Sequence, residues 1–215
     1  MNKASLFLLA ALALQGCTIT RSDSLIAFTP VPLKRAAVAD EIDGAAVRQV
    51  SVIDSRRDGY SGRPITDGRI LLNKRNGYGR KMEGVYAAAR PLAEYAKASL
   101  EDSLVRLGVA RQQHARYEIQ VILHEVDDPH YERGFFQSPA NYLTLAATVA
   151  VMETASQKEL WRQTILARTE LTFQGVFGGA DDYARALPSL MNDLVVRCVT
   201  APGFAEALRN GEVRT

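Results

Sequence analysis

Three segments in the second half of the chain read as β-strands, and they restrict the possible fold more than any other feature. Tyr117–Leu123 and Ile165–Phe173 alternate apolar and polar residues, whereas Leu143–Met152 is almost wholly apolar. A period of two places the apolar side chains on one face of a strand and the polar ones on the other. Because only a short polar segment, 153–159, separates the last two strands, they are predicted to form a hairpin. These patterns favour an antiparallel sheet with one solvated face.

Two amphipathic helices are predicted to cover the opposite face. Pro91 fits the first turn of one helix, which ends at Gly108, and Asp181 can cap the other, in which Pro188 should introduce a kink or a restart. Their apolar stripes are Leu92, Tyr95, Ala96, Leu100, Leu104 and Leu107, and then Leu187, Leu190, Met191, Leu194, Val195 and Cys198. A short helix is expected over Pro202–Arg209. The predicted fold class is therefore α+β, with a mostly antiparallel sheet under two helices.

The first half of the chain is less regular. Strands are predicted over Ser24–Thr29, Val47–Asp54 and Ile70–Asn73. Residues 55–84 hold six glycines among many charged residues and are expected to be irregular. Within them, Asn76-Gly77 is a dipeptide typical of tight hairpin turns.

The N-terminus predicts export and lipid attachment. Lys3 is followed by an apolar run of 11 residues, Ala4–Leu14, which fits a signal peptide and is shorter than the roughly 20 residues of a membrane-spanning helix. Leu14-Gln15-Gly16-Cys17 resembles the bacterial lipobox, in which the cysteine receives lipid and becomes the new N-terminus; an ordinary secretory signal with a chance cysteine is the alternative. The expected organisation is a signal peptide over 1–16, a tether over 17–24 and a single α+β domain over 25–215.

Lipidation of Cys17 has consequences for the mature chain. Only Cys198 would remain, so no internal disulfide could form. Two or more acyl chains, such as palmitate, anchor a protein stably. By resemblance to lipoprotein sorting, Thr18 after the cysteine favours the outer over the inner membrane, on its periplasmic face.

The order of these elements resembles the YajG-like family of small bacterial lipoproteins. The likeness is carried by the helix Leu92–Gly108, the strand Tyr117–Leu123, and the segment Leu171–Phe177 leading into Leu187–Met191. These are structural patterns, and the resemblance implies a lipoprotein fold without an activity.

Charge and composition limit the partners. The chain has 47% apolar and 23% charged residues and a net charge of +2, which excludes a general polyanion binder, so no nucleic acid is expected. The window Arg56–Glu83, however, holds eight basic and three acidic residues, a local charge of +5. Its residues Lys74, Arg75, Arg80 and Lys81 are the candidate contacts for an anionic ligand or a partner; the alternative is a solvated loop.

Catalytic signals are weak. His124, Glu125, Asp127, Asp128, His130 and Glu132 form a cluster that could hold a transition metal, although its spacing matches no established motif and a solvated strand end is the simpler interpretation. Acid–base work by Asp54 and Asp58 is a further alternative to solvated or capping roles. Phosphate-loop, nucleophile-elbow and His-Glu-x-x-His motifs are missing. No metal, cofactor or catalytic residue is therefore predicted.

Three functions remain in order of preference. The first is a non-enzymatic cell-envelope lipoprotein, held on the membrane through its lipid, that binds or supports another envelope component. The second is a binding module for an anionic envelope ligand, such as a lipid head group, lipopolysaccharide or peptidoglycan, through the 56–83 loop. The third is a metal-dependent hydrolase at His124–Glu132. The oligomeric state is left open.

Overall fold

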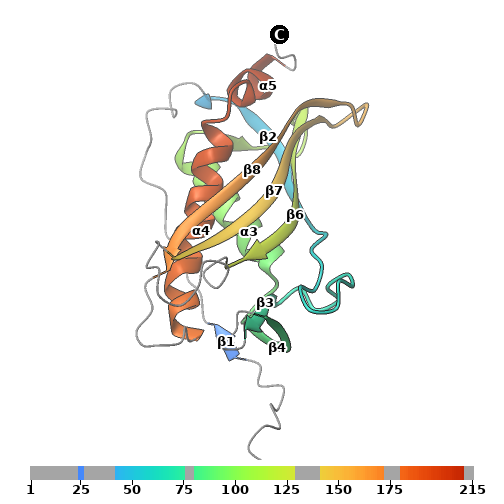
Figure 1. Ribbon diagram of the computed structural model, residues 1–215. Coiled ribbons are helices and arrows are strands. Elements are labelled where there is room, and N and C mark those ends of the chain that lie inside the picture. The colour runs from blue at the N-terminus through green and yellow to red at the C-terminus, as the bar shows by residue number, and fades with distance from the viewer. Residues whose placement is uncertain (1–23, 27–41, 76–79, 129–140, 172–179, 211–215) are drawn as a thin grey trace, which may run out of the picture.

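The computed structural model describes residues 24–26, 42–75, 80–128, 141–171 and 180–210. A five-stranded sheet forms its centre, in the order β5-β2-β6-β7-β8, and a three-stranded sheet, β1-β4-β3, lies at one end. Figure 1 shows this small sheet at the end of the molecule opposite α5. The strands are β1 (Ser24–Ile26), β2 (Ala46–Asp54), β3 (Ile70–Arg75), β4 (Lys81–Ala88), β5 (Ala110–Arg111), β6 (Tyr117–Asp127), β7 (Asn141–Glu153) and β8 (Glu159–Leu171), and the helices are α3 (Leu92–Arg106), α4 (Ala180–Val199) and α5 (Phe204–Asn210).

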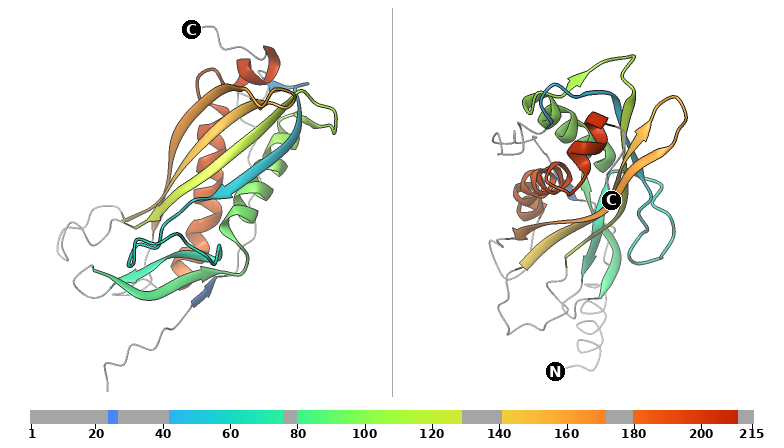
Figure 2. Two further views of the ribbon diagram at one scale, coloured as in Figure 1. Left: turned by 90° about the vertical axis from the view of Figure 1, so that its right-hand side faces the viewer. Right: turned by 90° about the horizontal axis from the view of Figure 1, so that it is seen from above.

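The predicted α+β class and the two covering helices are confirmed. Helix α3 packs against β2, and α4 packs against β8 and β7. Figure 2 shows both helices on the same face of the large sheet. Every residue of the two predicted apolar stripes is buried, and all but Tyr95 belong to one continuous core with the inward-facing side chains of β6, β7 and β8.

The sheets are mixed, which corrects the expectation of a mostly antiparallel arrangement. The β6–β7–β8 meander is antiparallel as predicted. Strand β2, however, runs parallel to both β6 and β5, and β1 runs parallel to β4. Between β2 and β6 the chain passes through α3, and a long crossover of this kind is what allows two strands to pair in parallel.

Boundaries differ locally from the prediction. The segment 55–84, expected to be irregular around the strand Ile70–Asn73, contains the first four residues of β4, and Arg75 and Lys81 both lie on strands. Asp181 lies in the first turn of α4, which starts at Ala180, and Pro188 lies inside a single helical span. The Asn76-Gly77 turn and the end of the strand predicted to Phe173 lie outside the described residues.

The C-terminus of α3 is closed as the sequence predicts. Leu107 caps the helix and Gly108 has a φ of 86°, a left-handed conformation that glycine adopts without strain. A Cβ atom here would also lie 2.0 Å from Oδ1 of Asp43, so this exposed side chain would have to move, and the left-handed φ would strain any other residue.

Candidate functional site

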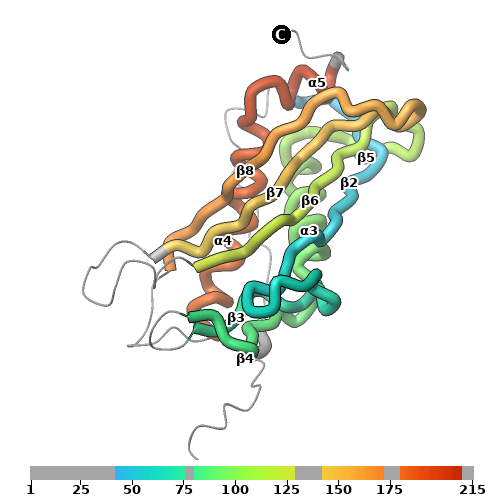
Figure 3. Tube along the Cα trace, turned by 45° about the vertical axis from the view of Figure 1, so that its right-hand side comes forward, coloured from blue at the N-terminus to red at the C-terminus, as the bar shows by residue number. Residues whose placement is uncertain are grey.

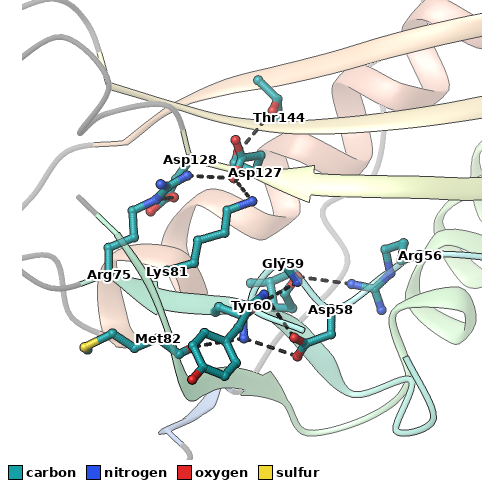
Figure 4. Close-up of polar contacts among 12 residues, drawn as sticks. Arg56, Asp58, Gly59, Tyr60, Arg75, Lys81, Met82, Asp127, Asp128 and Thr144 are labelled. Atoms are coloured by element: carbon teal, nitrogen blue, oxygen red, sulfur yellow. Dashed lines mark hydrogen bonds and ion pairs between the residues drawn. The ribbon is translucent and has the colours of Figure 1, made fainter. Parts of the chain in front are cut away.

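Two of the four basic residues predicted to contact a partner are held in ion pairs. Arg75, at the end of β3, places Nη2 2.9 Å from Oδ1 of Asp127 and Nε 2.8 Å from Oδ1 of Asp128. Lys81, at the start of β4, places Nζ 3.0 Å from the same Asp127 oxygen. Figure 4 shows both cations reaching from the small sheet to the end of β6. The positive charges of Arg75 and Lys81 are therefore neutralised by carboxylates of the same chain.

Asp128 is the most enclosed group of this set, with 2% of its surface exposed. Tyr183 of α4 donates its hydroxyl proton to Oδ2 over 2.6 Å. Burial raises the pKa of Asp128, against the opposing effect of the hydrogen bonds from Tyr183 and Arg75. We call Arg75, Lys81, Asp127, Asp128 and Tyr183 the ionic junction, because they join the small sheet, the large sheet and α4.

The other two candidate residues lie on the same hairpin. Lys74 holds Nζ 5.2 Å from the centre of the Tyr86 ring, a distance at which a cation is attracted to the ring face. Arg80 is exposed just before β4. The structure therefore separates the predicted set into two residues of the ionic junction and two closer to the surface.

A second buried cation lies at the start of the basic window. Arg56 is 2% exposed and grips Asp54, with Nε 2.8 Å from Oδ1 and Nη2 2.7 Å from Oδ2. The same guanidinium donates to the carbonyl oxygens of Leu71 and Gly68 over 3.1 and 3.2 Å. This arrangement fastens the loop after β2 to β3 and gives Asp54 a structural partner.

These pairs change the meaning of the local charge. The window Arg56–Glu83 carries +5 when it is counted alone. Three carboxylates from outside it, those of Asp54, Asp127 and Asp128, lie against its cations, and including them leaves +2. Much of the positive charge of this window therefore serves to form ion pairs within the protein.

The longest exposed run in the described part of the window is a hydrogen-bonded turn between Arg57 and Pro64. Oδ1 of Asp58 accepts hydrogen bonds from the backbone N–H groups of Tyr60 and Ser61 over 3.0 and 2.6 Å. Although partial burial raises the pKa of Asp58, hydrogen bonds from Ser61, Asn73 and Tyr60 hold it below its usual value. The turn presents Tyr60, which is 60% exposed, between exposed Arg57 and Arg63.

The described members of the proposed metal cluster do not share a face. A β-bulge follows Leu123, so His124 points to the open face of the sheet, where Nε2 lies 2.7 Å from Oγ1 of Thr148. Asp128 points the other way, toward Tyr183. His130 and Glu132 lie outside the described residues. Within the described ranges, no group of three or more potential ligands could hold a metal ion.

A largely apolar cavity lies elsewhere, between α3 and the outer edge of β2. It has a volume of about 210 Å³, and its lining includes Val47, Val50, Leu104, Val105 and Val109. The sequence does not predict this cavity, because the cavity forms at the point where β5 ends and β2 continues alone. A strand pair of only two residues has no recognisable sequence pattern.

Comparisons with known proteins show the fold. The sequence matches no protein-family model and no curated protein. Among solved structures, it is similar to protein XCC0632 of the DUF330 family from Xanthomonas campestris, with 14% identity, a TM-score of 0.50, and coverage of 80% of this chain and 92% of that one. Lipoprotein GNA1162 from Neisseria meningitidis has 10% identity and a TM-score of 0.32, over 59% and 83% of the two chains. The PelC dodecamer from Paraburkholderia phytofirmans has 11% identity and a TM-score of 0.33, over 77% and 93%.

The described helices were compared with the requirements of a membrane-spanning helix. None of those in the described ranges combines the length and the apolar character that a crossing requires. Cys17 and the apolar run before it lie outside the described residues.

Proposed function

We propose that this protein is a non-enzymatic cell-envelope lipoprotein, a YajG-like protein in which lipid on Cys17 holds one α+β domain to the membrane and the domain binds another envelope component. The observation that carries the proposal is the lipobox-like Leu14–Cys17, placed seven residues before β1, the first element that the structure describes. The fold likeness to the DUF330 protein accords with one α+β domain.

The candidate acid–base groups support a role without catalysis. Asp54 is gripped by Arg56, Asp58 accepts the hydrogen bonds of its own turn, and Asp128 is held by Arg75 and Tyr183. Each of these three carboxylates therefore has a structural role, because it accepts hydrogen bonds that hold its part of the fold. Cys198, the only cysteine expected in the mature chain, is buried, and burial raises the pKa of its thiol to about 12.

The position of the tether gives the domain an orientation. Seven residues span at most about 25 Å, so Ser24 and the small sheet to which β1 belongs would face the membrane. Helix α5 and the β7–β8 turn would point into the periplasm (Figure 1). Thr18 after the cysteine favours the outer membrane, with residues 1–16 removed as the signal peptide.

The test is Cys17→Ser. We expect this variant to lose lipid labelling and to be released from membranes into the soluble periplasmic fraction. Cys198→Ser is the matched control, because it removes the other cysteine and should leave labelling and membrane retention unchanged. Normal labelling of Cys17→Ser would contradict the lipoprotein assignment.

A second candidate function is favoured by the exposed turn with Arg57, Tyr60 and Arg63. At the membrane-facing end, this turn could contact an anionic envelope ligand through its two cations and its aromatic ring. Replacing all three residues by Ser should reduce retention on phosphatidylglycerol vesicles in a salt-sensitive manner, since exposed charges are screened over about 8 Å at physiological ionic strength. Equal retention on phosphatidylcholine vesicles would contradict it.

A further inference from the structure

One edge of the large sheet is open over most of its length. On its outer side, β2 pairs with β5 through Ala46 and Val47, and in the described parts of the chain no strand pairs with that side beyond them. Figure 3 shows β2 as the outermost long strand, with β5 beside its first residues. An unpaired edge of this kind is a template for another strand.

The hydrogen-bonding direction of the edge follows from its pairing with β6. The N–H of Ser55 donates to the carbonyl oxygen of Leu123 over 3.0 Å, so Ser55 directs its backbone groups toward β6. Because alternate residues of a strand point their backbone groups to opposite sides, Val50, Val52 and Asp54 direct theirs to the open edge. They offer donors and acceptors every second residue, a repeat of about 6.6 Å.

The cavity described above opens beside this edge. Val50 of β2 and Val109, which precedes β5, line it, and α3 forms its far wall. Val105 at the rim is 63% exposed, an unusual position for a large apolar side chain on a helix that buries its three leucines, Leu92, Leu100 and Leu104. A side chain entering from the edge would therefore meet apolar surface.

The charges around the cavity are balanced in pairs. Glu101 Oε1 lies 3.3 Å from Arg111 Nη1, and Asp102 Oδ2 lies 2.9 Å from Arg106 Nε. A charged occupant would have to compete with these pairs, whereas an uncharged one would leave them in place. The electrostatics of the rim therefore suit a neutral ligand.

We propose that the edge Val50–Asp54 is a strand-addition site for an extended, uncharged segment of another envelope protein, with an apolar side chain of that segment seated in the cavity. An extended backbone matches donors and acceptors repeated every two residues, and it would continue the line that β5 begins. The inference rests on the proposed function as a binding lipoprotein and names the surface and the kind of partner.

A second copy of the chain fits the edge less well. Two β2 edges related by a two-fold axis would pair in antiparallel fashion, which turns one molecule end over end relative to the other. Their small sheets, and hence their tethers, would then point in opposite directions. Two copies anchored in one membrane could not adopt that arrangement, which argues against a two-fold dimer, and we assign the edge to a different protein.

The experiment uses the purified lipidated chain in detergent as bait for a library of short random peptides displayed on phage. Val105→Glu places a carboxylate at the cavity rim, and Ala98→Glu is the matched control, an exposed α3 position that does not line the cavity. Val52→Pro removes one edge-facing N–H without removing a donor to β6. Peptide affinity is then measured by fluorescence anisotropy for all variants.

We expect selected peptides with apolar residues at alternate positions and no proline in the paired run. Their affinity should fall at least ten-fold for Val105→Glu and Val52→Pro and stay unchanged for Ala98→Glu. Peptides with helical spacing, equal affinity for Val105→Glu and Ala98→Glu, or failure to enrich any peptide would overturn the proposal. Dimerisation of the chain that Val52→Pro abolishes would also overturn it, because the occupant would be a second copy. None of these results depends on membrane retention, which tests the lipoprotein assignment separately.

Discussion

Arg56 should be a main support of the loop that follows β2, and Arg56→Met tests this. The substitution removes four side-chain hydrogen bonds, two to Asp54 and one each to the carbonyl oxygens of Leu71 and Gly68. Removing one partner of a buried ion pair costs about 3 to 5 kcal/mol. Because the Asp54 side chain is 16% exposed and water can reach its carboxylate, we expect a loss of about 3 kcal/mol.

Urea denaturation of the soluble Cys17→Ser chain measures this loss through the fluorescence of Trp161, the only tryptophan, which is buried. The control is Arg69→Met, whose pair with Asp67 is about half exposed on both sides and should contribute less than about 1 kcal/mol. Arg56→Met combined with Asp54→Leu should recover part of the stability, since no uncompensated carboxylate remains. Equal losses for Arg56→Met and Arg69→Met would refute the structural role of Arg56.

Three further predictions follow from individual contacts. Hydrogen bonds from Arg69 lower the pKa of Asp67 to about 2, so this pair stabilises the fold above the ordinary pKa and loses that effect as the pH falls toward 2; an NMR titration should show the low midpoint, and Arg69→Gln should raise it. Cys198 should resist iodoacetamide in the native protein and react once the chain is denatured, and rapid native labelling would contradict its burial. Tyr183→Phe leaves the buried Asp128 short of one donor and should cost about 1 to 3 kcal/mol in urea denaturation, whereas a neutral result would show that water replaces the hydroxyl.

The elements that sequence reasoning found are those whose pattern is local. The periods of α3, α4, β6 and β8 repeat several times within each segment, so the buried face can be read from spacing alone. Strand β4 was missed because Lys81–Ala88 begins with two charged residues and a glycine among its first four and adjoins a glycine-rich stretch. The burial of β4 depends on tertiary packing, which the spacing of apolar residues in the sequence does not reveal.

The direction of β2 was missed for a different reason. A strand, a long connection containing a helix, and another strand form the arrangement that favours parallel pairing, and the order of β2, α3 and β6 contains it. The pattern of the three later strands indicates an antiparallel meander but carries no information on the direction of β2. The parallel pairing of β2 with β6 could therefore be predicted from the order of the elements in the sequence.

The candidate site was less accessible, because its charges are matched over long distances in the chain. Arg75 meets Asp127 and Asp128 across 52 and 53 residues, and a sequence window around Arg75 contains neither. The sequence also predicts that changing Lys74, Arg75, Arg80 and Lys81 together to Ser preserves folding. The structure revises this, since losing Arg75 would leave Asp128 buried without its cation.

The parallel pairing of β2 with β6 also bears on the order in which the chain folds. The β7–β8 hairpin closes over a few residues, and β6 joins it through antiparallel contacts, so these strands can assemble early with α4 against them. Residues of β2 must wait for partners about 70 positions later in the sequence, and such distant contacts form slowly. We therefore expect the N-terminal part of the domain to be the last to acquire native structure, although on our proposal it is the part nearest the lipid. On our proposal, an exported chain would then be fixed to its membrane at Cys17 before β2 has paired with β6.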